Sequence, residues 1–217
     1  MTSFDLVNRN CMKTAFTIFF ALFLFAVFTA EAQHNINPIA RKLNDSAVNI
    51  GMAGDDDQLR KAIDLFNQAI KIDSNNILPY WNKMNFQNQL KQYNEAIVTG
   101  CQMIKMRPKD VVIKMTVGEI YDRSEDSINS KKLYNTALSI LNVQLDTMSK
   151  RNAEYRLCLE KKAFMLILLN QAENGHEILN ELYNSEIDER KKTALKMFLD
   201  WNKHDIIYGK ETTSDSY

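Results

Sequence analysis

The sequence has 217 residues, of which 45% are hydrophobic, and its 27 Lys and Arg residues balance 27 Asp and Glu residues. This length suffices for one domain with a continuous core. A neutral chain without a basic cluster argues against a nucleic-acid-binding protein, because phosphate contacts need a concentrated positive surface.

The first predicted element is an apolar segment near the N-terminus. Lys13 precedes an unbroken run of apolar and small residues over 14–30, and a small-x-small site ends at Ala32. This combination is typical of a cleaved secretory signal peptide. We therefore predict a signal peptide over 1–32, with Met12 as a second candidate start, and an exported, periplasmic or envelope-associated protein. The alternative is an uncleaved anchor, since the run approaches the shortest membrane-spanning helices of about 17 residues.

A repeat of 34 residues organises the rest of the chain. Small residues recur at this spacing, followed four and seven residues later by further matching positions. The three sets are Ala62, Ala96 and Ser130, then Phe66, Gly100 and Tyr134, then Ala69, Met103 and Ala137. A fixed period of this length with helix-like apolar spacing predicts an all-α solenoid, in which each helix pair buries its apolar face on the next.

These positions resemble the tetratricopeptide repeat (TPR) family. Ala62, Phe66 and Ala69 match the small, aromatic and alanine positions of the family's second helix, and Gly118 and Tyr121 match two positions of its first helix. The resemblance implies a right-handed α-solenoid. Within a repeat domain over 33–208 we predict repeats over about 43–76, 77–110 and 111–144, a degenerate pair over 156–189, a capping helix over 188–208, and a tail over 209–217.

The sequence carries no pattern that indicates catalysis or a metal site. The glycines fall at small-residue positions, turns or helix ends, and the three histidines are scattered. Cys101 and Cys158 form no Cys-x-x-Cys motif, and we expect both to stay unpaired. The acidic run over 55–57 lacks the spacing of a calcium loop and is interpreted as a helix cap. We therefore predict a non-enzymatic protein without a cofactor or metal.

The resemblance implies that the first helix of each repeat lines a concave groove that grips an extended peptide or a helix. The candidate partner-binding residues are Trp81, Asn82, Asn85 and Asn88 in the second repeat and Met115, Glu119 and Asp122 in the third. An exposed tryptophan flanked by amides is typical of a recognition surface. The alternative is that Trp81 packs inward and Tyr80 outward.

The function predicted from these features is an exported scaffold that binds a protein or peptide partner in the groove, within a cell-envelope assembly. One alternative is a periplasmic module that binds a glycan or small ligand, with Trp81 and the amides as its platform. The other is a membrane-anchored periplasmic subunit. A cytosolic chaperone adaptor is disfavoured, because only Asn82 fits the clamp by which some family members bind chaperone C-termini.

Overall fold

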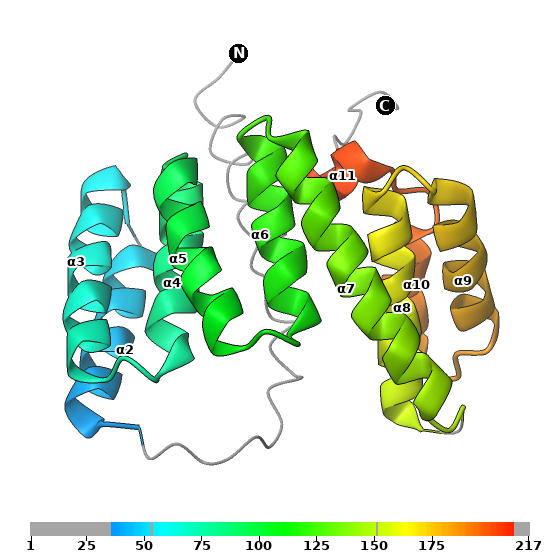
Figure 1. Cartoon of the computed structure of the whole chain (residues 1–217), viewed down its shortest axis with the longest axis horizontal. Coiled ribbons are helices and arrows are strands. Elements are labelled where there is room, and N and C mark those ends of the chain that lie inside the picture. The colour runs from blue at the N-terminus through cyan, green and yellow to red at the C-terminus, as the bar shows by residue number, and fades with distance from the viewer. Residues whose placement is uncertain (1–35, 53, 151, 211–217) are drawn as a thin grey trace.

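The structure is a computed structural model, and it describes residues 36–52, 54–150 and 152–210 (Figure 1). These residues form ten helices and no strand, where the repeat pattern predicted about nine helices. The helices are α2 (Pro38–Met52), α3 (Asp56–Ile72), α4 (Ile77–Gln89), α5 (Tyr93–Met106), α6 (Val111–Arg123), α7 (Ser127–Thr147), α8 (Ala153–Leu168), α9 (Ala172–Asn184), α10 (Glu189–Phe198) and α11 (Lys203–Tyr208). The predicted signal peptide over 1–32 lies outside the described residues.

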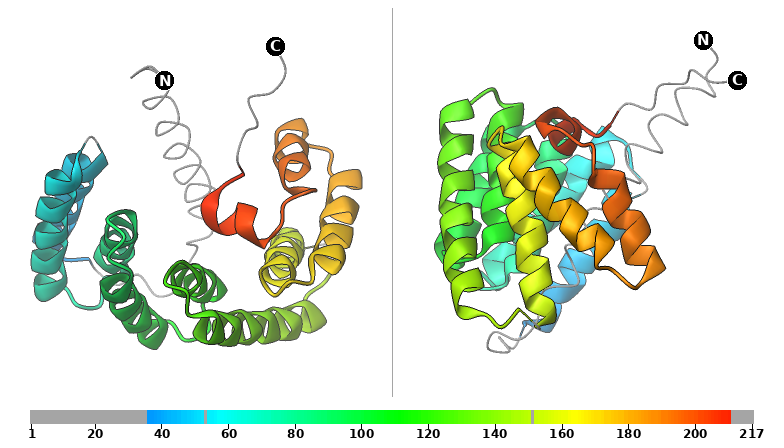
Figure 2. Two further views of the ribbon diagram at one scale, coloured as in Figure 1. Left: turned by 90° about the horizontal axis from the view of Figure 1, so that it is seen from above. Right: turned by 90° about the vertical axis from the view of Figure 1, so that its right-hand side faces the viewer.

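Four helix pairs, α2/α3, α4/α5, α6/α7 and α8/α9, follow one another along the stack. Each pair contacts the next, α3 with α4, α5 with α6, and α7 with α8. The stack bends into an arc, with α6 and α8 on the inner side and α7 and α9 on the outer side (Figure 2). We call the inner side of the arc the inner face. In the repeat register α4 corresponds to α6, so α4 also belongs to the inner face. The predicted all-α solenoid with a TPR-like fold is confirmed.

The small residues of the repeat lie where helices approach most closely. Ala62, Ala96 and Ser130 are fully buried. Gly118 shows why size matters at such contacts, because a Cβ atom added there would lie 2.4 Å from Cε1 of Tyr134. The 34-residue period therefore reflects a packing requirement that recurs in each helix pair.

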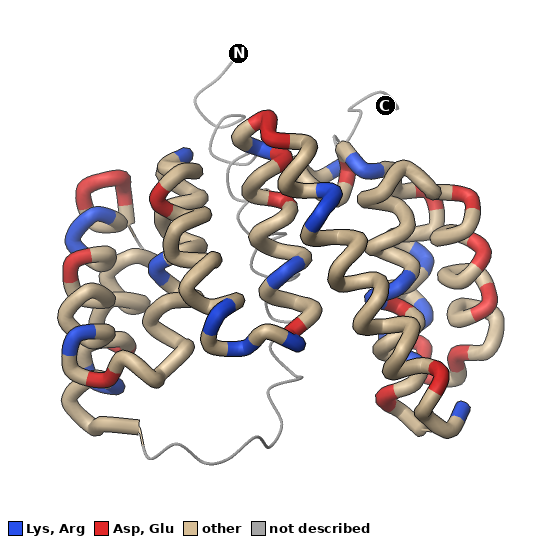
Figure 3. The backbone as a smooth tube through the Cα atoms, viewed as in Figure 1, with Lys and Arg blue, Asp and Glu red and all other residues tan. Residues whose placement is uncertain are grey.

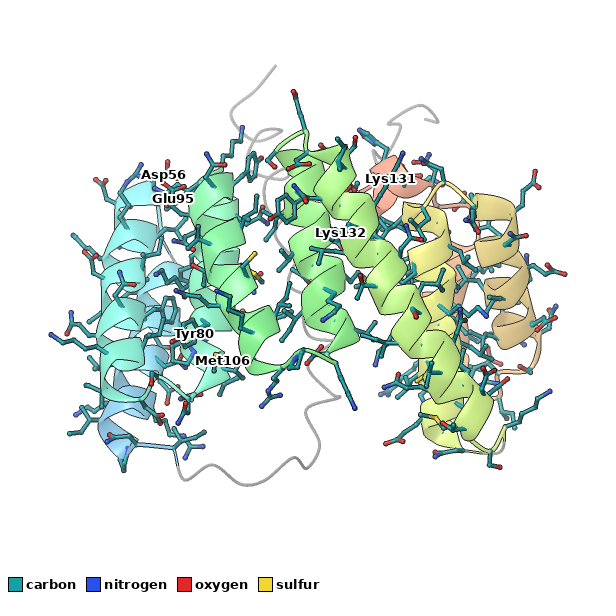
Figure 4. The ribbon with its side chains drawn as sticks, viewed as in Figure 1. Asp56, Tyr80, Glu95, Met106, Lys131 and Lys132 are labelled. Carbon is teal, nitrogen blue, oxygen red and sulfur yellow. The ribbon has the colours of Figure 1, made fainter. Side chains whose placement is uncertain are left out.

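The connections before α4 and α6 each accept a hydrogen bond from a side chain in the following helix, at equivalent positions but from different residue types. Tyr80, which is labelled in Figure 4, donates its hydroxyl to the carbonyl of Ser74 over 3.3 Å. Lys114, which lies 34 residues further along the chain, donates its ammonium to the carbonyl of Pro108. Both bonds join the first turn of a helix to the connection before it. Lys114 is buried at the position that Tyr80 occupies one repeat earlier.

The C-terminal region differs from the prediction. In place of one capping helix over 188–208, α10 ends at Phe198 and α11 begins at Lys203. Asn202 accounts for the break, because it caps α11 in a reciprocal capping box with Asp205, and this arrangement competes with continued helix. α11 then turns to the inner face, where it contacts α6 and α8 (Figure 2). α7 also passes the predicted repeat boundary at residue 144.

Candidate functional site

The predicted site begins with a row of amides on α4. Asn82 donates its Nδ2 to Oδ1 of Asn44 on α2 over 2.9 Å. Asn85 and Asn88 are half-buried, and Oδ1 of Asn88 is enclosed without a hydrogen-bond donor. Residues three apart on a helix are surface neighbours. The structure therefore places these three predicted residues along one side of α4 and ties the first of them to α2.

Trp81 does not have the exposed position expected of it. It is 6% exposed and belongs to a core cluster with Tyr80 and Met84 of α4 and Ile113 and Val117 of α6. The physical reason is that α4 packs against both α3 and α5, so that neighbouring helices cover adjacent sides of it and bury both aromatic residues. The expectation of an exposed indole is wrong, and the glycan platform that required this ring loses its main element.

Met115 is also buried rather than open to a groove. It is 1% exposed and shares a core cluster with Trp201, Ile206 and Ile207 from the C-terminal region. The reason is that α11 folds back and brings apolar side chains to the inner face beside α6. The place predicted for a partner at Met115 is therefore filled by the chain itself.

The carboxylate of Asp122 is fully engaged within the chain. Oδ1 accepts hydrogen bonds from the hydroxyl of Ser130 over 2.7 Å and from the ammonium of Lys203 over 2.9 Å. Oδ2 accepts the hydroxyl of Tyr134 over 2.8 Å. Asp122 thus joins α6 to α7 and to α11, so its role in this structure is to hold helices together.

Two further side chains bind backbone carbonyls of the C-terminal region. Arg123 donates from Nε to the carbonyl of Ile207 over 3.2 Å, and its Nη2 bonds the same oxygen. Nε2 of His176 on α9 lies 2.7 Å from the carbonyl of Trp201. Sequence reasoning missed these contacts. A composition signal was present in the isoleucine pair 206–207, which is apolar and lies in the last turn of the predicted capping helix over 188–208.

Glu119, like Asn88, has a buried oxygen without a hydrogen-bond donor. It is 7% exposed, and its Oε1 is enclosed without a donor. Burial raises the pKa of its carboxyl to about 7, against an opposing effect of Arg123 and with a smaller contribution from Asp122. Because Glu119 precedes these residues by four and three positions, all three share one face of α6. That face is the one to which α11 is bound.

Charged residues of both signs are mixed over the described backbone (Figure 3). An open cavity of about 390 Å³ lies between the α4–α5 turn and the α6–α7 turn. Its lining includes Lys91 and Arg123 together with Glu95 and Glu125. Because the charges around it are balanced, this cavity does not define a site for an anion or a cation.

The remaining sequence features have structural roles. Asp55 accepts the backbone amides of Asp57 and Gln58, so its interpretation as a helix cap is confirmed. Cys101 is half-buried, Cys158 is buried, and both thiols are free. Over 36–52, 54–150 and 152–210, no group of three or more His, Cys, Asp or Glu side chains is arranged to hold a metal ion. In the same described ranges no helix combines the length and apolarity needed to span a bilayer.

No protein-family profile and no curated protein matches the chain. Solved structures of similar fold include a crystal structure of MamA, with 12% identity, a TM-score of 0.47, and coverage of 71% of this chain and 81% of that one. A thermophilic TPR protein of Thermus thermophilus has 20% identity and a TM-score of 0.49, covering 77% and 86%. MamA 41-end from Desulfovibrio magneticus RS-1 has 13% identity and a TM-score of 0.39, covering 76% and 99%. These similarities concern the fold alone.

Proposed function

We propose that the chain is an exported, non-enzymatic scaffold that binds a protein or peptide partner on its inner face. The observation that carries the proposal is the pair of enclosed acceptor oxygens at two predicted site residues, Oδ1 of Asn88 on α4 and Oε1 of Glu119 on α6. Buried acceptors without donors are uncommon in folded proteins and call for an explanation. A partner that displaces the groups covering these two oxygens and brings N–H groups to the inner face would satisfy both.

The half-buried amides of α4 support the same surface. Asn85 and Asn88 each carry a donor and an acceptor, which is the chemistry that pairs with the backbone of a bound peptide. Asn82 is already held by Asn44, so α2 fixes the first side chain of the row. The row is therefore partly positioned before any partner arrives, which reduces the entropy lost on binding.

A capture experiment with matched variants tests this proposal. Asn85→Arg places a bulky charge in the amide row, and Asn67→Arg makes the same change at an exposed position of α3. The native chain and Asn67→Arg should retain the same protein from envelope extracts, whereas Asn85→Arg should lose it. Equal retention by both variants would remove the inner face as the binding surface.

Export is part of the proposal and rests on the leader over 1–32. N-terminal sequencing of the protein recovered from cells should begin at Gln33. Recovery from membranes alone, with the leader intact, would favour the anchored periplasmic subunit instead.

A further inference from the structure

The structure shows that the inner face already binds a helix. α11 contacts α6 and α8, and its residues Ile206 and Ile207 are buried there. Polar bonds hold the same helix at both ends, from Lys203 to Asp122 and from the carbonyl of Ile207 to Arg123. We call the part of α6 and α8 that contacts α11 the helix seat.

The contacts of the helix seat determine which side chains a bound helix must carry and in which direction that helix runs. Asp122 receives the lysine that begins α11, and the next residue, Arg123, binds a carbonyl in the last turn of that helix. Cations are favourable near helix C-termini because unpaired carbonyls carry partial negative charge there. The buried side chains of Ile206 and Ile207 add an apolar contact to these two polar contacts. This combination is typical of helix-in-groove recognition.

Two features indicate that α11 is a replaceable occupant. It spans only Lys203–Tyr208, and a helix this short is unstable without the surface that it packs on. Oε1 of Glu119 also has no donor while α11 is bound, although Glu119 shares the face of α6 that holds α11. A longer helix with a basic or amide side chain opposite Glu119 would satisfy this oxygen and make additional contacts.

We propose that the helix seat is the binding site for an amphipathic helix of a partner protein, and that α11 occupies it until such a helix displaces it. The partner helix carries a lysine three residues before a pair of branched apolar residues, together with a donor for Glu119. This inference rests on the proposed function and adds to it the class of partner and a segment that competes with it.

A labelled peptide with the sequence of residues 199–210 tests the seat directly in the full chain. Ile207→Asp in the protein releases α11, and Ile187→Asp makes the same change at a residue that is 90% exposed. Fluorescence anisotropy should show the peptide binding roughly tenfold more tightly to Ile207→Asp than to the native chain or Ile187→Asp. A peptide carrying Lys203→Glu should lose roughly that gain.

Equal affinity of the three proteins for the native peptide would overturn the proposal, provided that circular dichroism shows the same helix content. Hydrogen exchange of the native chain gives a second test that needs no variant. The amides of Ile206 and Gly209, bonded to Asn202 and Asp205, should exchange at least roughly tenfold faster than those in the middle of α6. Equal protection would show that α11 is a fixed part of the core.

The two proposals can fail separately. If the peptide does not bind any variant but Asn85→Arg still abolishes capture of the envelope partner, the inner face binds a partner without a helix seat. If the peptide binds the released variant and no partner depends on Asn85, the seat serves only the chain's own C-terminal helix, and the partner-binding role of both surfaces is contradicted.

Discussion

The ammonium of Lys203 lies 2.9 Å from the carboxylate of Asp122, although the two residues are 81 positions apart in the chain. The same carboxylate accepts the hydroxyls of Ser130 and Tyr134 on α7. Asp122 therefore joins the third repeat to the C-terminal helix α11. Its three partners are the reason that it cannot serve as an open contact for a ligand in this structure.

Asp122→Asn should lower the free energy of unfolding by about 2 kcal/mol, because charge-assisted hydrogen bonds contribute about 1.5–3 kcal/mol. Lys203→Met should cost less, about 1 kcal/mol, since Lys203 is 20% exposed and the bonds from Ser130 and Tyr134 remain. Urea unfolding of both single variants and the double variant measures the coupling between the residues. Equal losses from the two single changes would contradict the wider role of Asp122.

Glu119 should make the protein less stable as the pH rises. Burial raises the pKa of its carboxyl to about 7 in the folded state, whereas the ordinary value is 4.5. The folded state therefore holds this proton more tightly, and the resulting stabilisation is full below about pH 4.5 and is lost as the pH passes about 7. The size of the effect is roughly 3 kcal/mol. Glu119→Gln should flatten the dependence of unfolding free energy on pH within this window.

Glu160 is a second carboxyl that should contribute to this pH dependence. Burial raises the pKa of its carboxyl to about 7 as well, so Glu160→Gln should remove a separate part of the same slope. The double variant should then show the flattest profile between pH 4.5 and 7. A Glu119→Gln profile that coincides with that of the native chain would show that Glu119 does not titrate in this window.

The stack could be predicted because its cause recurs locally along the chain. Each helix pair meets the next in the same way, so small residues return at Ala62, Ala96 and Ser130. The position of α11 could not be predicted in this way, because the bond between Lys203 and Asp122 joins segments that no repeat relates. A local pattern indicates a helix, but it does not say against which distant helix that helix will pack.

The candidate site shows the same limit. The register identified Asn88 and Glu119 as residues of interest, but only the packing of the chain reveals that an oxygen of each lacks a donor. The predicted exposure of Trp81 was wrong because an aromatic side chain at the edge of a helix face is solvent-exposed in an isolated helix pair but is covered by the next pair in a stack. Its core cluster includes Ile113 and Val117, which come from the next repeat. Exposure is therefore a property of the assembled arc, whereas the pairing of helices is already set within one repeat.

Gly118→Ala should destabilise the protein, although alanine is the better helix former by about 1 kcal/mol. The added Cβ would lie 2.4 Å from Cε1 of Tyr134, and overpacking of this kind costs about 1–3 kcal/mol. Thermal melts should therefore show a lower Tm for Gly118→Ala. In a Tyr134→Leu background the same change should cost less, because the ring that obstructs it is gone. If the loss of stability in the double variant equals the sum of the losses in the two single variants, the two residues do not obstruct each other.

The turns after α4, α6 and α8 share a strained backbone position that offers a stabilising change. Lys91, Glu125 and Asn170 have φ values of 58°, 65° and 63°, in the left-handed region that favours glycine. Glu125→Gly should raise the free energy of unfolding by up to about 1 kcal/mol, because the relief of about 1–2 kcal/mol exceeds the added entropy of an unfolded glycine. Asn170→Gly is the matched control and should gain less, since asparagine tolerates this conformation. Urea unfolding measures both changes, and a larger gain at Asn170 than at Glu125 would show that backbone strain does not govern these turns.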